Sequence, residues 1–339
     1  MQGAAGWFAN AEPAVARPGP PACTIVIDTE EDFPWADPVE GTPDNTEHLR
    51  HLPELQAVFG AFGAIPAYMV TWRVLEDADA VALLRREHAA GRCVLGLHLH
   101  TWVTPPLLGV RDHRLSFAGN LAPEIEAAKL RALAAQFEAA FGFPARTYRA
   151  GRYGLGPASP ALLEELGINV DTSVAPRSDF SAEGGPDYGG FDYAPFWFGK
   201  SRRVLELPLG RAIVGHAGAR AAALYHGVRS GAWPRLAVSL VSRLRLAERM
   251  TLSPEGHDAP TMIRLVRGLA ARGQAVYPVS FHSSSIWPGR NPYVTNAAEQ
   301  RQFYDRLSGV LAHLRDAAGA QFVALDDIPG QFVPPAEQN

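Results

Sequence analysis

Short apolar segments alternate with longer helical patterns along most of this 339-residue chain. Segments such as CTIVID at 23–28 and CVLGLH at 93–98 have the length and aliphatic composition of buried strands. Strand patterns occur at 23–28, 65–70, 93–98, 146–150, 168–172, 203–208, 275–281 and 321–325. Helical patterns lie between them, at 47–62, 77–90, 122–141, 158–166, 258–272 and 296–318. This alternation predicts an α/β fold with a parallel sheet, either open or closed into a barrel.

The pattern continues without an internal repeat or a linker-like composition. We therefore expect one domain over 22–335, preceded by an irregular segment at 1–21. The longest region without a strand or helix pattern is 174–202, which is rich in glycine and in aromatic residues. Long loops inside a compact domain are usually functional or mobile. The aromatic side chains suit a sugar ring, and they are equally consistent with simply anchoring the loop.

Composition excludes several classes of protein. Hydrophobic residues make up 47% of the chain and charged residues 19%, which excludes wholesale disorder. The formal net charge of −4 gives no electrostatic reason to expect nucleic acid as a partner. The two cysteines, Cys23 and Cys93, cannot build a disulfide framework or a zinc ribbon, and both lie in apolar runs typical of buried free thiols.

The sequence also bears on membranes and location. The first 22 residues lack the basic start and apolar run of a signal peptide, and no stretch of 18 apolar residues predicts a transmembrane helix. The segment at 233–250 is amphipathic and contains arginine, so we expect a surface helix packed on its own domain, with peripheral membrane contact as the alternative. These features predict a cytoplasmic protein and leave the oligomeric state open.

Polar residues gather where the predicted strands end. In parallel sheets and barrels, functional sites lie at the carboxyl ends of the strands. The residues at these ends are Asp28, Glu30, Glu31 and Asp32; His98, His100 and Trp102; Arg149, Arg152 and Tyr153; Asp171 and Ser173; and His282 to Ser285. Their shared position at strand ends predicts a single site.

Two of these groups have the composition of a metal site. Side chains alternate along a strand, so Asp28 and Glu30 point one way, and so do His98 and His100. Two imidazoles and a carboxylate suit zinc or another divalent first-row ion. Four acids within five residues repel one another unless solvent or a cation relieves them, and Glu31 and Asp32 are also consistent with a solvated turn.

Three further residues suit acid–base chemistry beside such a metal. His282 is a natural general acid at the end of its strand. Arg149 would orient a neighbouring carboxylate and keep it ionised. Asp171 could orient either of these two residues.

With these residues in view, the chain resembles the polysaccharide deacetylases that carry a NodB homology domain, the carbohydrate esterase family 4 type. It is most similar to the WalW-type branch. The segments that carry the resemblance are IDTEEDFPW (27–35), LGLHLHTWVTPP (95–106), FAGNLAPEIEAAKL (117–130), YRAGRYGLG (148–156), VDTSVAP (170–176), LELPLG (205–210) and SFHSSSIWPGRNPYV (280–294). They follow the family's order over nearly the whole chain.

The resemblance implies a distorted (β/α) barrel of about seven strands. It also implies hydrolysis of an N-acetyl or O-acetyl group on a sugar of a glycan or glycan precursor, with one divalent metal, zinc or alternatively cobalt, nickel or manganese. Asp28 matches the catalytic base, Glu30 the acidic ligand, His98 the first histidine ligand, Arg149 the arginine that positions the base, and His282 the general acid. Residues expected to contact the sugar are Trp102, Arg152, Tyr153 and Trp197.

The chain departs from the family pattern at two positions. The second histidine of the family lies four residues after the first, where this chain has Trp102, so we assign His100 instead. Thr29 follows Asp28 where an adjacent pair of aspartates is familiar, and Glu31 is the alternative acidic ligand. The competing functions are a metal-dependent hydrolase of a non-sugar amide bond and a sugar-binding module that has lost catalysis.

Overall fold

Seven parallel strands form the centre of the molecule. The computed structural model describes residues 4–8, 11–35, 45–109, 112–200, 204–215 and 246–334, together with residues 220 and 225. The parallel strands are β2 (Ala22–Thr29), β3 (Pro66–Val70), β4 (Val94–Leu99), β5 (Thr147–Ala150), β6 (Val170–Asp171), β8 (Val204–Glu206) and β11 (Val276–His282). They pair in the order β8-β6-β5-β4-β3-β2-β11. Each coincides with a predicted strand, so the α/β prediction and the strand number are confirmed.

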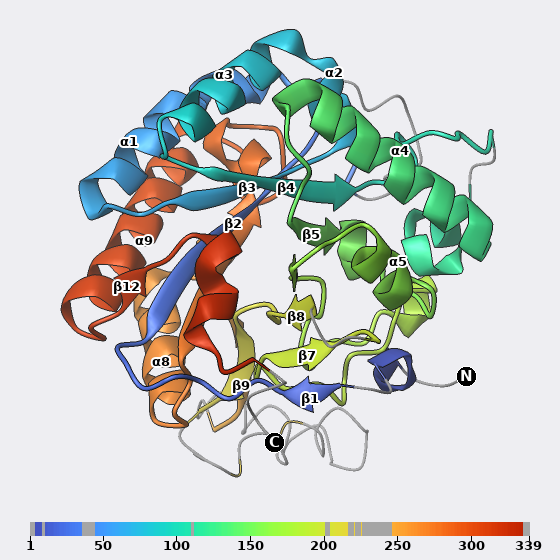
Figure 1. Cartoon of the computed structure of the whole chain (residues 1–339). Helices are drawn as coiled ribbons and strands as arrows, with labels where there is room; N and C mark the ends of the chain where they lie inside the picture. Colours follow the sequence, from blue (N-terminus) through green and yellow to red (C-terminus); the bar gives the residue numbers. More distant parts are fainter. Residues whose placement is uncertain are drawn as a thin grey trace.

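Helices surround this sheet on the outside (Figure 1). They are α1 (Leu52–Phe62), α2 (Trp72–Glu76), α3 (Ala78–Ala89), α4 (Pro123–Phe141), α5 (Ser159–Glu165), α8 (Ala259–Ala270) and α9 (Ala297–Asp316). Every residue of β2 and β3 is buried, because one face of the sheet meets the helices and the other faces the interior. The strand patterns are therefore continuous apolar runs without polar alternation, as in the sequence. The short helix α2 is the one helix of this set that the sequence did not predict.

Short strands complete the sheet at its margins. β12 (Gln321–Phe322) pairs with β2, while β7 (Phe196–Phe198) pairs antiparallel with β8 and with β1 (Glu12–Pro13). β7 lies within 174–202, where no strand was predicted, because the aromatic run Phe196–Phe198 fills the space between β8 and β1. The predicted strand at 321–325 ends early, since a 3-10 segment begins at Leu325.

A separate antiparallel pair of strands, called the hairpin below although a long segment connects the two, lies between β8 and β11 in the sequence. β9 (Arg211–Val214) and β10 (Glu248–Thr251) pair antiparallel, and no ladder joins them to the main sheet within the described residues. One backbone hydrogen bond joins this hairpin to β11, since Ser280 N–H donates to Leu252 O over 3.1 Å, while Leu252 N–H donates to Gly210 O over 2.6 Å beside β9. The wall is thus irregular at this point, as a distorted barrel requires.

The hairpin corrects one prediction. The helix expected at 233–250 falls mostly on residues 233–245, which lie outside the described part of the chain, but Glu248–Met250 belong to β10. Met250 is buried opposite Ala212, so packing against β9 determines the local structure here. Among the helices that the structure describes, none combines the length and the apolar composition needed to cross a bilayer.

Candidate metal and acid–base site

The carboxyl ends of β2 and β4 bring Glu30, His98 and His100 together. Glu30 Oε2 lies 3.4 Å from His98 Nε2 and 3.2 Å from His100 Nε2. One possible ligand atom from each of the three residues lies within 4.8 Å of those of the other two, and all three side chains are buried. The parallel pairing of β2, β3 and β4 explains the convergence, since their carboxyl ends meet at one edge.

Hydrogen bonds on the other side of each ring orient the two histidines. His98 Nδ1 lies 3.0 Å from the backbone oxygen of Arg149, and His100 Nδ1 lies 2.8 Å from Glu31 Oε1. A carbonyl and a carboxylate only accept, so each Nδ1 carries a proton, and the Nε2 atom of each ring faces Glu30. Glu31 Oε2 accepts from the Thr71 hydroxyl over 2.7 Å, so both oxygens of Glu31 are already engaged.

This donor set fits a divalent metal ion. Glu30 Oε1 is buried and has no hydrogen-bond partner, which is costly unless a cation satisfies it. Two neutral imidazole nitrogens and a carboxylate oxygen form the usual ligand set of a catalytic zinc, with further positions free for water and substrate. The buried Glu-His-His triad can therefore hold a metal.

The charges of these residues are strongly coupled. Burial on its own would raise the pKa of Glu30, but the positive charge of His282 and hydrogen bonds from His100 and His98 bring it well below its usual range. Burial would lower the pKa of His100, and the charge of Glu31 with hydrogen bonds to both glutamates instead raises it to about 9. The lowered pKa keeps Glu30 ionised, and the raised pKa favours a positively charged His100 beside it.

Asp28 lies at the centre of the same strand edge. Its Oδ1 accepts from Arg149 Nη1 of β5 over 2.9 Å, and its Oδ2 lies 3.6 Å from His282 Nε2 of β11. Asp28 and Arg149 are buried, while the His282 side chain keeps about a fifth of its surface exposed. A carboxylate, a guanidinium and an imidazole from three strands therefore meet at one point.

Glu255 holds the opposite edge of the His282 ring. Its Oε2 lies 2.8 Å from His282 Nδ1, and its Oε1 accepts from the His282 backbone N–H over 2.9 Å and from the Ser285 hydroxyl. Burial alone would lower the pKa of His282, but the charges of Glu255 and Glu30 and the Glu255 hydrogen bond raise it well above its usual value. Nδ1 therefore carries a proton, and Nε2 faces Asp28.

Glu255 was missed in the sequence because it occurs in the turn SPEG at 253–256, which follows a strand that the sequence did not predict. A single acid in a glycine-containing turn gives no signal that separates it from a solvated residue. Asp171, which was expected to orient Arg149 or His282, instead accepts from the Ser173 hydroxyl and lies beside Glu206. Burial raises the pKa of Asp171 to about 6 and that of Glu206 well above its usual range, so the two carboxyls share a proton.

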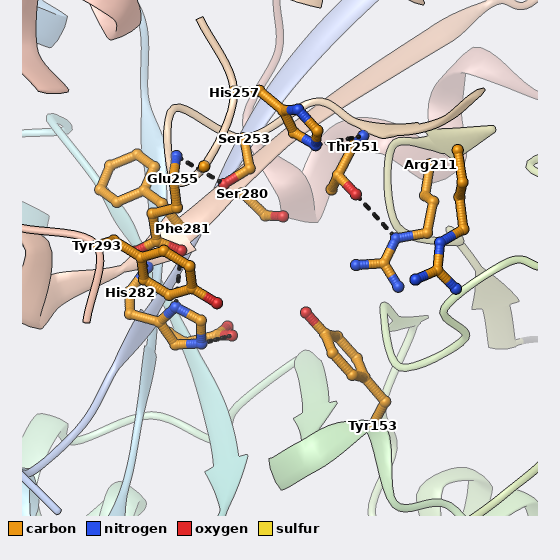
Figure 2. A pocket seen from close by; sticks show the side chains of 13 residues that line it. Tyr153, Arg211, Thr251, Ser253, Glu255, His257, Ser280, Phe281, His282 and Tyr293 are labelled. Carbon is orange, nitrogen blue, oxygen red and sulfur yellow. Dashed lines mark hydrogen bonds and ion pairs between the residues drawn. The ribbon is translucent and has the colours of Figure 1, made fainter. Parts of the chain in front are cut away.

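The site opens into a cleft with two connected lobes. A cavity of about 450 Å³ is lined by the triad residues together with Trp35 and Arg152, and a cavity of about 360 Å³ continues beside His282. Both are lined by Asp28, Tyr153, Arg211, Arg249, His282 and Tyr293. In Figure 2 the hydroxyl of Tyr153 and the guanidinium of Arg211 point into the space that faces His282.

Two of the four expected sugar contacts line the cleft, and the two tryptophans do not. Arg152 and Tyr153 line the cleft, and both have the left-handed backbone conformation that is unusual outside glycine, with φ of 54° and 58°. Trp102 stacks on the His100 ring with centroids 4.1 Å apart and lines neither lobe. Trp197 of β7 is buried in an apolar cluster with Leu205 and Leu207, also away from both lobes.

Comparisons with known proteins place this geometry in a fold. No family profile matches the chain, and a search of curated proteins found no match. A solved structure described as a polysaccharide deacetylase from Mycobacterium smegmatis is 15% identical, covers 95% of this chain and 93% of its own, and has a TM-score of 0.52. PuuE allantoinase is 12% identical over 94% of this chain and 93% of its own, with a TM-score of 0.55.

A third structure, described as a polysaccharide deacetylase from Pseudomonas aeruginosa, is 12% identical over 91% of this chain and 90% of its own, with a TM-score of 0.51. Likeness at such low identity concerns the backbone fold alone. The chain therefore has the NodB-like (β/α) barrel fold of these deacetylases and of the allantoinase.

Proposed function

We propose that this chain is a metal-dependent hydrolase that removes an acetyl group from the nitrogen of an acetylated sugar. The observation that carries the proposal is the buried triad of Glu30, His98 and His100 beside the pair Asp28 and His282 in one cleft. A metal site next to an acid–base pair is the composition that amide hydrolysis needs. The likeness in fold to proteins described as polysaccharide deacetylases supports the sugar as substrate. The segments at 117–130, 148–156 and 280–294 favour the WalW-type branch.

In this proposal Glu30, His98 and His100 hold the metal, with zinc as the expected ion. When bound, the metal supplies Lewis acidity, which polarises the acetyl carbonyl and lowers the pKa of water. Asp28 accepts the proton of the attacking water, and Arg149 orients Asp28 and stabilises its negative charge. His282 Nε2 donates a proton to the leaving nitrogen, and Glu255 fixes the ring with Nδ1 protonated. The products are acetate and an amino sugar.

Metal content and acetate release test this proposal together. We expect about one equivalent of a divalent transition metal per chain in the parent protein and none in the His98→Ala/His100→Ala double variant. Asp28→Asn should retain the metal but lose at least about a hundredfold in kcat, since it removes the proton acceptor alone. Equal metal content in parent and double variant would overturn the ligand assignment, and near-normal turnover by Asp28→Asn would overturn the base assignment.

A second candidate is hydrolysis of a non-sugar amide bond, which the likeness in fold to PuuE allantoinase favours. The metal and the acid–base pair would act in the same way on such a substrate. A panel that contains N-acetylated sugars and cyclic amides separates the two candidates. Metal binding without turnover of any of these compounds would favour the sugar-binding module.

A further inference from the structure

The smaller lobe of the cleft carries positive charge that the proposed chemistry does not use. Its wall on the hairpin side is formed by Arg211 of β9 with Arg249 and Thr251 of β10, and His257 lies in the turn that follows. The same lobe reaches Asp28 and His282, so whatever occupies it lies next to the proposed reaction centre. Figure 2 shows Arg211 across this space from His282.

The hydrogen bonds of the two arginines leave their charge uncompensated. Arg211 Nε donates to the Thr251 hydroxyl over 2.9 Å and its Nη1 to the Ser178 hydroxyl over 2.6 Å. Arg249 Nη1 donates to the backbone oxygen of Arg177 over 3.1 Å. All three acceptors are neutral, and neither guanidinium forms an ion pair with a carboxylate among the described residues.

The acids of the cleft are committed elsewhere. Both oxygens of Glu255 bind His282 and Ser285, and Asp28 accepts from Arg149. Nor does His257 supply compensation, because its Nε2 accepts the Thr251 backbone N–H over 3.3 Å. Burial lowers the pKa of His257, and the charge of Arg211 lowers it further. The cleft is therefore divided into an acidic half around Glu30 and a basic half around Arg211 and Arg249.

Two partly buried guanidinium groups that share a cavity repel each other, and an anion between them relieves that cost. Burial, together with the charge of Arg249, accordingly lowers the pKa of Arg211. Planar guanidinium groups bind phosphate and carboxylate through paired N–H donors, which a neutral sugar hydroxyl cannot match in strength. A lobe of about 360 Å³ is large enough for such a substituent together with part of a sugar ring.

We propose that Arg211 and Arg249 bind an anionic substituent of the acetylated sugar, a phosphate or a carboxylate, while the acetyl group lies at the triad. This inference rests on the proposed function and adds the class of substrate to it. Neutral acetylated sugars would lack the contact and would bind weakly. The preference is expressed mainly in KM, because the anionic substituent takes no part in the bond that breaks, so the contact is the same before and during the reaction.

Kinetics on a matched set of sugars test the preference. The metal-loaded parent is compared on N-acetylglucosamine, N-acetylglucosamine 1-phosphate and a disaccharide of N-acetylglucosamine with glucuronate. We expect kcat/KM for one of the charged sugars to exceed that of the neutral sugar at least about tenfold, and which one it is distinguishes phosphate from carboxylate. Arg249→Gln should abolish the difference and Arg249→Lys should keep part of it. Equal kcat/KM on all three sugars in the parent would overturn the inference.

Arg264→Gln provides the matched control. Arg264 lies on α8, 4.0 Å from Glu248 of the same hairpin, and it lines neither lobe. This variant removes one positive charge beside the same hairpin and leaves the lining of the cavity unchanged. It should retain the preference for the charged sugar, and loss of the preference here would assign the effect to overall charge and overturn the inference.

Calorimetry with inorganic phosphate and with glucuronate separates this inference from the proposed function. The His98→Ala/His100→Ala variant is used beside the parent, so that binding to a metal cannot produce the signal. Saturable binding of one probe that survives in the double variant and disappears in Arg249→Gln supports the anion subsite even if no sugar is hydrolysed. If neither probe binds either protein, the subsite is overturned, while acetate release from neutral sugars would still support the proposed function.

Discussion

Each histidine of the triad has one ring nitrogen engaged by a hydrogen-bond acceptor, and this arrangement distinguishes the two neighbouring glutamates. Glu31 accepts from His100 Nδ1 and from Thr71, so it orients a ring from behind. Glu30 lies on the Nε2 side and retains an oxygen without a partner. The sequence left this choice open because side-chain alternation is defined only within the strand, and β2 ends at Thr29.

The contact between Glu255 and His282 leads to a prediction for the pH dependence of turnover. Burial opposes the charged form of His282, and the carboxylate of Glu255 is the largest of the influences that raise its pKa. Because the protonated ring is the proposed acid, activity should persist at alkaline pH until His282 loses its proton. Glu255→Gln keeps an acceptor for Nδ1 but removes the charge, so the alkaline limb of kcat/KM should move to lower pH.

Steady-state pH profiles of the parent and of Glu255→Gln check this prediction. Glu165→Gln serves as the control, because Glu165 pairs with the exposed Arg131 on the outer surface. Its profile should match that of the parent. An unchanged alkaline limb in Glu255→Gln, with activity reduced equally at every pH, would show that Glu255 only supports the local structure.

At the scale of elements, Gly210 determines how closely the β9–β10 hairpin approaches β11. A Cβ built on Gly210 would lie 2.2 Å from the backbone oxygen of Pro278 in β11. The backbone oxygen of Gly210 also accepts a hydrogen bond from the Leu252 N–H. Backbone cannot move aside cheaply, so Gly210→Ala should lower the free energy of unfolding by about 2 kcal/mol or more. It should also displace the adjacent Arg211. Denaturant unfolding of the parent and the variant measures the first effect.

Gly60→Ala is the matched control for this substitution. Gly60 lies in α1, and a Cβ built there meets no atom within 4 Å. Alanine in a helix should stabilise the protein by about 0.5–1 kcal/mol. If both variants unfolded at the same denaturant concentration, the close approach at Gly210 would not be a constraint on the hairpin.

Elements with a strong local signal were predictable from the sequence, whereas those that depend on distant partners were not. The seven parallel strands are continuous apolar runs between helical patterns, and residues such as His98 and Arg149 could be assigned to their ends. β9 and β10 are four residues each and are held by one another, so neither has a pattern of its own. Arg211, Arg249 and Glu255 all belong to this hairpin and the turn after it, and for this reason they were missed.

The aromatic residues show the same distinction. Tyr153 lies three residues after the end of β5 and lines the cleft. The aromatic composition of 174–202 predicts a sugar contact at Trp197, but β7 pairs with β8 and places the Trp197 side chain in the core. Residue type alone could not show that Tyr153 lies in the cleft and Trp197 in the core. The position of Trp197 depends on the pairing of β7 with β1 and β8, and β1 is far away in the sequence.

For the whole molecule, the barrel architecture gathers side chains that are widely separated along the chain. Asp28 of β2 contacts Arg149 of β5 and approaches His282 of β11, so one carboxylate connects three strands of the wall. The triad connects β2 to β4 on either side of β3. Ligation of a metal at these strand ends therefore requires the assembled barrel, because the ligands are about 70 positions apart in an unfolded chain.

This arrangement predicts that metal and global stability are linked. A ligand that binds only the folded state stabilises it by about 2.7 kcal/mol at a free concentration of 100 times Kd. Chelation should therefore lower the unfolding temperature of the parent by several degrees, and added zinc should restore it.

The His98→Ala/His100→Ala variant should unfold at the same temperature with and without chelator. His51→Ala, which removes a partly exposed histidine paired with Glu54, should respond as the parent does. An equal response in the double variant would mean that the stabilising metal binds elsewhere, and that β2 and β4 are joined by hydrogen bonds through β3 alone.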